Sequence, residues 1–262
     1  MSRPFVAGYF PEITRTFPRV LQLLFPDDIA QLCPEFVPGS VRHPSLAVFA
    51  LGGIWIGAQG AYQYKTLRWW RAAFGCFGLM NFFALFLHCL VTITPGRTEV
   101  EEQPLLWSLD CLFTGLSSCA IVGACLDRLI DSARFWKAVT FAICLTSALL
   151  ATVIFCRHTS TIGLELFYLV PLAFAGQVCF AAMLKELRPA CLATVVLGGL
   201  LPVAGVVFDR YSCQIMRESV FYDLLGAPAL MFAGCDVAFM GLKMWIDSIF
   251  FRRKSSDDLK RQ

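Results

Sequence analysis

Long apolar stretches separated by short polar connections dominate the pattern along the chain. Seven of them are predicted to span a membrane as helices, at 45–64, 72–93, 105–126, 135–155, 162–184, 190–208 and 225–251. A helix crosses an apolar core of about 30 Å with about 20 residues. Because the apolar residues come in blocks rather than in one stripe per turn, the pattern favours membrane helices over a soluble core. The predicted fold is all-α, a polytopic membrane bundle of seven transmembrane helices.

Three regions follow from this pattern. Residues 1–44 combine charged side chains with repeated prolines and contain no apolar run ahead of a small-residue cleavage site, so no signal peptide is predicted. They are expected to form an N-terminal surface segment, either irregular or partly a helix lying in the membrane interface. Residues 45–251 form the transmembrane domain. Residues 252–262 form a basic tail.

Composition supports a membrane class. Hydrophobic residues make up 57% of the chain and charged residues 16%, with a mean hydropathy of +0.65. Soluble domains carry about 25% charged residues. The net charge of +3 is too small to suggest a nucleic-acid partner. The lipid bilayer is therefore the expected partner.

Lysine and arginine predict the orientation. They are concentrated in the connections 65–71, 127–134 and 185–189 and in the tail 252–262, and they are sparser in the connections of the opposite side. Short cytosolic loops carry the excess of positive charge. We therefore expect the C terminus in the cytosol and the N terminus outside or in a lumen. Tryptophans near span ends are expected as interfacial anchors: Trp69, Trp70, Trp107, Trp136 and Trp245.

Cysteine and histidine suggest no metal site. Most of the 12 cysteines lie inside predicted spans, where they act as small packing residues. The chain has no CxxC pair, and its three histidines lie in separate places, so neither a zinc site nor another cofactor is predicted. Cys33 and Cys213 both fall on the predicted outer side, which permits a disulfide between them if they meet in space.

Polar side chains inside the spans are the candidates for function. Asp236 lies nearest the middle of its span, where an unpaired charge costs at least about 2.5 kcal/mol. Such a group requires partners within the bundle. We therefore predict a small polar site around Asp236, completed by Glu165, Gln177 and Asn81, that binds a small or lipid-like ligand.

Other polar residues have simpler interpretations. Asn81 and His88 are seven residues apart and so share one face of their helix. Asp110 lies early in its span and reads as an interfacial carboxylate, which is also the simpler interpretation of Glu165. Lys243 is expected to extend to the cytosolic headgroups.

Three other functions remain open. A lipid-modifying intramembrane enzyme would use Asp236 and Glu165 as acid and base. A seven-helix receptor is suggested by Asp127-Arg128-Leu129 at the inner end of the third span, although the last span has no NPxxY motif. A transporter would be expected to show an internal repeat, and none is visible. No recognisable catalytic constellation favours an enzyme.

Several short motifs follow one another in the second half of the chain. They are Gly163-Leu164-Glu165, Ala175-Gly176-Gln177, Val206-Val207-Phe208-Asp209, Leu225-Gly226 and Cys235-Asp236-Val237. In this order they resemble the C-terminal half of the transmembrane protein 187 family, an uncharacterised vertebrate family. The resemblance extends loosely over residues 40–250 and implies a multi-pass membrane protein. It implies no particular activity, and the family begins with a more hydrophobic segment than residues 1–25.

Overall fold

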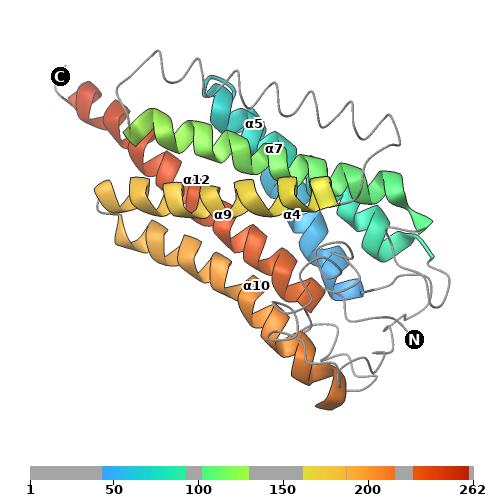
Figure 1. Cartoon of the computed structure of the whole chain (residues 1–262). Coiled ribbons are helices and arrows are strands. Elements are labelled where there is room, and N and C mark those ends of the chain that lie inside the picture. Colours follow the sequence, from blue (N-terminus) through green and yellow to red (C-terminus); the bar gives the residue numbers. More distant parts are fainter. Residues whose placement is uncertain (1–42, 93–101, 130–161, 187, 216–226, 260–262) are drawn as a thin grey trace.

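The structure is a computed structural model that describes residues 43–92, 102–129, 162–186, 188–215 and 227–259. Each regular element within these ranges is a helix (Figure 1). The helices are α4 (Pro44–Gln63), α5 (Arg68–Ala84), the π-helical turn η2 (Leu85–Leu90), α7 (Pro104–Leu129), α9 (Ile162–Lys185), α10 (Pro189–Ile215) and α12 (Ala227–Leu259).

Four of the described helices are long and apolar enough to cross a membrane, namely Pro44–Gln63, Arg68–Leu90, Pro104–Leu129 and Ala229–Phe250. Two shorter apolar stretches, Pro171–Lys185 and Pro189–Gly205, lie in α9 and α10. Helices therefore occur at six of the predicted spans. The predicted span 135–155, most of the segment 1–44 and the end of the tail lie outside the described residues. The all-helical class and the membrane assignment are thus supported, whereas the seventh helix stays a prediction.

Prolines occupy two kinds of position in these helices. Pro171 and Pro202 lie inside α9 and α10, which continue through them. Pro228 lies in the first turn of α12, where its missing N–H has no intrahelical partner to lose. Pro228 therefore helps to begin a helix rather than to bend one.

Glycines let α4 and α5 pack closely. A Cβ on Gly57 would lie 2.5 Å from the Cα of Gly78, and a Cβ on Gly60 would overlap the ring of Phe74. Gly53, Gly57 and Gly60 are spaced four and three residues apart, so they form one face of α4. Small residues at such spacing allow membrane helices to approach closely. The pairing of later α4 residues with earlier α5 residues shows that the two helices are antiparallel.

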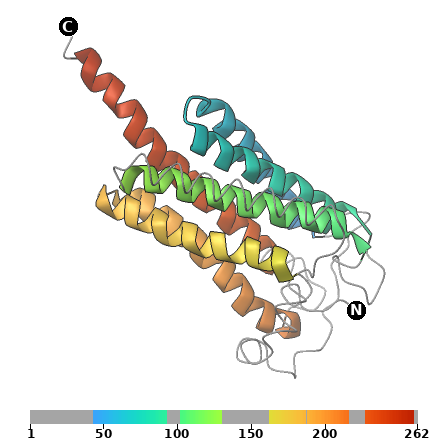
Figure 2. The same ribbon diagram turned by 45° about the horizontal axis from the view of Figure 1, so that its top comes forward.

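Glycines also let α10 and α12 pack closely. A Cβ on Gly198 would lie 2.5 Å from the backbone nitrogen of Ala238, and a Cβ on Gly234 would overlap Pro202. These two helices are also antiparallel, and they lie side by side in both Figure 1 and Figure 2. Figure 2 also shows α12 continuing beyond its neighbours towards Leu259.

Two helix pairs run parallel. Along α7 and α9, Asp110 and Tyr168 line one cavity near the start of both helices, and Arg128 contacts Glu186 at their C-terminal ends. Along α4 and α12, Gly52 lies against Asp236, and Tyr64 hydrogen-bonds to Asp247. Hence α4, α7, α9 and α12 all point towards one end of the bundle, and α5 and α10 point the other way. We call this end the basic end, because it carries Lys65, Arg68, Arg71, Arg128 and Lys185.

Aromatic side chains fill the space between α5 and α12. Phe77 stacks on Phe239 with ring centroids 3.7 Å apart, and Phe74 meets Phe239 edge to face at 5.3 Å. Closer to the basic end, Trp70 and Trp245 form a perpendicular pair at 5.8 Å. Edge-to-face and stacked pairs contribute about 0.5–1.5 kcal/mol beyond the area that they bury.

The expectation of interfacial tryptophans is wrong for three of the five; Trp69 is half-buried, and Trp136 lies outside the described residues. Trp70, Trp107 and Trp245 are buried inside the bundle and do not anchor it at the interface. Trp245 tolerates burial because its indole nitrogen donates a hydrogen bond to Glu186 at 3.3 Å. The most exposed tryptophan of the described residues is Trp55, on the outer face of α4.

Large apolar side chains cover the outside of the helices. Examples are Val48 and Leu51 on α4 and Leu197, Leu200 and Val203 on α10, each more than half exposed. A soluble monomer rarely exposes contiguous apolar faces of this kind. The outer surface thus agrees with a bundle embedded in lipid.

Candidate ligand-binding site in the helical bundle

Asn81 on α5 and Asp236 on α12 face the same segment of α4. A Cβ on Gly52 would lie 3.1 Å from Oδ2 of Asp236, and a Cβ on Gly53 would overlap the amide group of Asn81. Gly52 and Gly53 are consecutive, so two of the four predicted site residues pack against neighbouring positions of α4. Asn81 is completely buried and Asp236 is 7% exposed.

The two side chains present acceptor atoms without matching donors. Asn81 uses its Nδ2 to donate to the carbonyl oxygen of Phe77, one turn back, at 2.9 Å. Oδ1 of Asn81 and Oδ1 of Asp236 are buried and have no hydrogen-bond partner among the described residues. A buried polar atom left unsatisfied costs about 1–3 kcal/mol. The site therefore favours an added group that supplies a proton or a positive charge.

A small cavity lies between α5, α7, α9 and α12. Its volume is about 20 Å³. It is lined by Met80, Asp110, Thr114, Tyr168, Met231, Phe232 and Cys235. Met80 and Cys235 directly precede Asn81 and Asp236, so the cavity lies next to the two predicted site residues along α5 and α12. A volume of about 10–15 Å³ is enough for one water, so the cavity can hold water but not a lipid chain.

Asp110 and His88 form a buried pair beside this cavity. His88 Nε2 lies 3.7 Å from Oδ2 of Asp110, and both side chains are almost fully buried. His88 belongs to η2, where the N–H of Val91 bonds to the carbonyl of Phe86, five residues back. Asn81 and His88 were predicted to share one face, and both are completely buried within the bundle. The interpretation of Asp110 as an interfacial carboxylate is wrong, because only 2% of the residue is exposed.

The other predicted site residues do not join Asn81 and Asp236. Gln177 lies on an exposed face of α9. Glu165 lies in the first turn of α9, and its side chain is outside the described part. The predicted disulfide also falls outside it, since Cys33 precedes the described residues and only the backbone of Cys213, in α10, is described.

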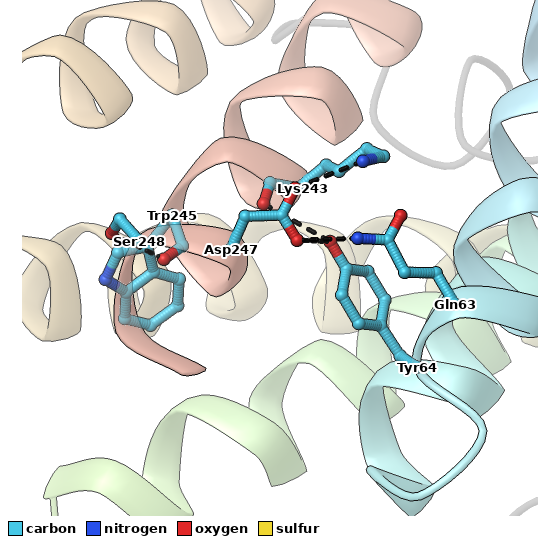
Figure 3. Close-up of polar contacts among 6 residues, drawn as sticks. All are labelled: Gln63, Tyr64, Lys243, Trp245, Asp247 and Ser248. Atoms are coloured by element: carbon cyan, nitrogen blue, oxygen red, sulfur yellow. Dashed lines mark hydrogen bonds and ion pairs between the residues drawn. The ribbon is translucent and has the colours of Figure 1, made fainter. Parts of the chain in front are cut away.

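A polar network closes the basic end between α4 and α12 (Figure 3). Oδ1 of Asp247 accepts hydrogen bonds from Nε2 of Gln63 and from the hydroxyl of Tyr64, both at 2.8 Å. Oδ2 of Asp247 pairs with Nζ of Lys243 at 3.1 Å. Lys243 thus neutralises a carboxylate one helical turn away.

A second polar network joins α7, α9 and α12 at the same end. Glu186 accepts the indole N–H of Trp245 and lies 3.9 Å from the guanidinium of Arg128. The guanidinium carbon of Arg128 lies 4.7 Å from the centre of the Phe250 ring. No local pattern in the sequence indicates this network, because residues far apart in the chain meet in it.

Comparisons with known proteins give no further identification. No protein family model, no curated protein and no solved structure matches this chain. Any inference about function therefore begins from the geometry of the buried polar residues.

Proposed function

We propose that this chain is a seven-helix membrane protein that binds a small monovalent cation between α4, α5 and α12. The observation that carries the proposal is the pair of buried, unsatisfied oxygens, Oδ1 of Asn81 and Oδ1 of Asp236, beside Gly52 and Gly53. An ionised aspartate inside a membrane bundle requires a compensating positive charge. The nearby glycines leave no side chain to provide one.

The chemistry of the two ligands selects the class of cation. A carboxylate and an amide carbonyl are hard oxygen donors, which suit alkali or alkaline-earth ions better than soft metals. No group of three His, Cys, Asp or Glu side chains capable of holding a metal occurs in the described ranges. With one carboxylate, the charge of the site matches a single positive charge. A proton on Asp236 is the alternative way to neutralise it.

The direction of the described helices supports a seventh crossing. Both α7 and α9 point towards the basic end, so the chain has to return to the opposite end between Leu129 and Ile162. The predicted span 135–155 is long enough for that return. With it, successive helices would alternate in direction along the whole domain. The predicted orientation, with the basic end in the cytosol, follows from the same residues.

Neither alternative function gains support. The cavity beside Asp110 has room for a water and not for the lipid substrate of a lipid-modifying enzyme. Receptor and transporter functions are both compatible with a cation-binding bundle. The resemblance to the transmembrane protein 187 family stays a prediction.

The proposal is tested by thermal unfolding of the purified protein in detergent. Sodium, lithium and potassium chlorides are compared with N-methylglucamine chloride at equal ionic strength. A cation present at 100 times its Kd stabilises the folded state by about 2.7 kcal/mol. We expect one alkali ion to raise the melting temperature of the wild type and to have no such effect on Asp236→Asn, which keeps the shape of the side chain but removes its charge.

The matched control is Asp247→Asn, the same charge change at the basic end of the same helix. It should keep the cation-dependent shift. A wild-type protein whose melting temperature is the same in all four salts would contradict the proposal, and so would an Asp236→Asn variant that responds like the wild type. A shift that follows pH but not the cation would identify a proton as the neutralising group.

A further inference from the structure

An open groove lies on the outer face of α4 and α5 at the basic end. Its volume is about 580 Å³. Three basic residues border it, namely Lys65 in the turn between the helices and Arg68 and Arg71 in the first turn of α5. Its apolar wall is formed by small or aliphatic residues, including Ala61, Ala72, Gly75 and Leu79.

The three basic side chains are available to an anion. All three are exposed, and none forms an ion pair with an acidic residue of the described part. The Nζ of Lys65 lies 5.9 Å from the ring of Tyr62, a contact that leaves its charge uncompensated. Arg68 and Arg71 are three residues apart and lie on the same side of α5. They can therefore contact one ligand together.

The beginning of α5 adds to the positive potential. Its N-cap residue, Leu67, makes no side-chain cap hydrogen bond, and its first turn contains no acidic residue. The first N–H groups of a helix have no intrahelical partner and carry a partial positive charge. They favour an anion beside the side chains of Arg68 and Arg71.

The apolar wall indicates which kind of anion fits. Gly75 lies over Ala61, where an added Cβ would be 3.9 Å from the Cβ of Ala61, so the two helices present a shallow, smooth channel there. Leu79, two turns further from the basic residues, is 44% exposed. A soluble phosphate would contact only the three basic residues of the groove. A lipid would place its headgroup at the charges and one acyl chain along the channel.

We propose that this groove binds an anionic phospholipid, with the headgroup phosphate at Lys65, Arg68 and Arg71 and an acyl chain along Ala72 and Gly75. Basic pockets between membrane helices bind anionic headgroups in this way. This site uses none of the residues of the proposed cation site, so either proposal can fail alone.

The test is native mass spectrometry of the full-length protein in detergent, with phosphatidylserine and phosphatidylcholine of identical acyl chains at equal concentration. We expect phosphatidylserine adducts to exceed phosphatidylcholine adducts at least tenfold. The variant Lys65→Gln/Arg68→Gln/Arg71→Gln should bring this ratio close to one. Each single substitution should lower it by roughly fivefold, the effect of one basic residue near an anionic surface.

The matched control is Arg252→Gln/Arg253→Gln/Lys254→Gln, which removes the same charge from the segment after the last span and should keep the preference. Ala72→Leu should reduce binding of phosphatidylserine by filling the channel. Water-soluble glycerophosphoserine at the lipid concentration should not compete. Equal binding of both lipids, loss of preference in the control variant, or full competition by glycerophosphoserine would each overturn the proposal.

Discussion

Replacing Gly57 by alanine tests whether α4 and α5 are held by direct backbone contact. The added Cβ would lie 2.5 Å from both the Cα and the nitrogen of Gly78 and 2.8 Å from the carbonyl oxygen of Phe74. These neighbours are backbone atoms, which cannot turn aside as a side chain can. The two helices would have to separate or slide.

The expected cost follows from two opposing effects. Overpacking a tightly packed contact typically costs about 1–3 kcal/mol. Alanine in place of a mid-helix glycine recovers about 0.5–1 kcal/mol through the lower entropy of the unfolded chain. We therefore expect Gly57→Ala to lower the free energy of unfolding by about 1–2 kcal/mol.

Three other glycine substitutions calibrate the experiment. A Cβ on Gly75 would be in ordinary contact, and a Cβ on Gly176 or Gly199 would have nothing within 4 Å. These alanine variants should be unchanged or more stable by up to about 1 kcal/mol. The assay is reversible unfolding of the purified protein in mixed detergent, followed by circular dichroism. If Gly57→Ala were as stable as Gly75→Ala, the close approach of the two helices described above would be wrong.

Two further substitutions have definite outcomes. Tyr64→Phe should destabilise the protein by about 1 kcal/mol, because it removes the 2.8 Å hydrogen bond to the Asp247 carboxylate. The control Tyr62→Phe changes a residue that is 79% exposed and should leave the free energy of unfolding unchanged. Equal effects of the two substitutions would refute the stabilising role of the network around Asp247. Gly53→Ala should both destabilise the bundle and abolish the cation-dependent rise in melting temperature, because its Cβ would displace the Asn81 amide. A variant that is destabilised but keeps the full cation response would show that Asn81 is not a ligand of the cation.

The positions of the helices were largely predictable. The length and hydropathy of an apolar block decide whether it can cross a membrane, and both are local properties of the sequence. Asp236 and Asn81 could be chosen for a related reason, since the cost of burying a polar group in a bilayer applies wherever the group lies.

The faces of the helices were much less predictable. In a soluble protein a polar stripe marks the outside of a helix, but lipid and protein interior are both apolar, so α9 carries little information about which side turns inward. Gln177 was for this reason expected inside and is exposed. Asp110 was expected at the interface, and its burial depends on His88, a partner that local sequence cannot indicate.

Tryptophan was misleading for a similar reason. Its ring suits both the headgroup region and the protein interior, provided that the indole N–H finds an acceptor. Trp245 has such an acceptor in Glu186, which lies on a different helix. The glycine spacing of α4, in contrast, was visible in the sequence and could have predicted the contact with α5.

Close packing and the polar site share one structural cause. The absence of side chains at Gly52 and Gly53 draws α5 and α12 towards α4, and the same absence leaves the oxygens of Asn81 and Asp236 without a donor. A larger residue at either position would keep the polar groups away from α4. A helix interface optimised only for packing would not place two polar residues against its glycines, because each unsatisfied oxygen costs free energy there. The proposed cation, or a proton on Asp236, would offset this cost, which packing alone does not.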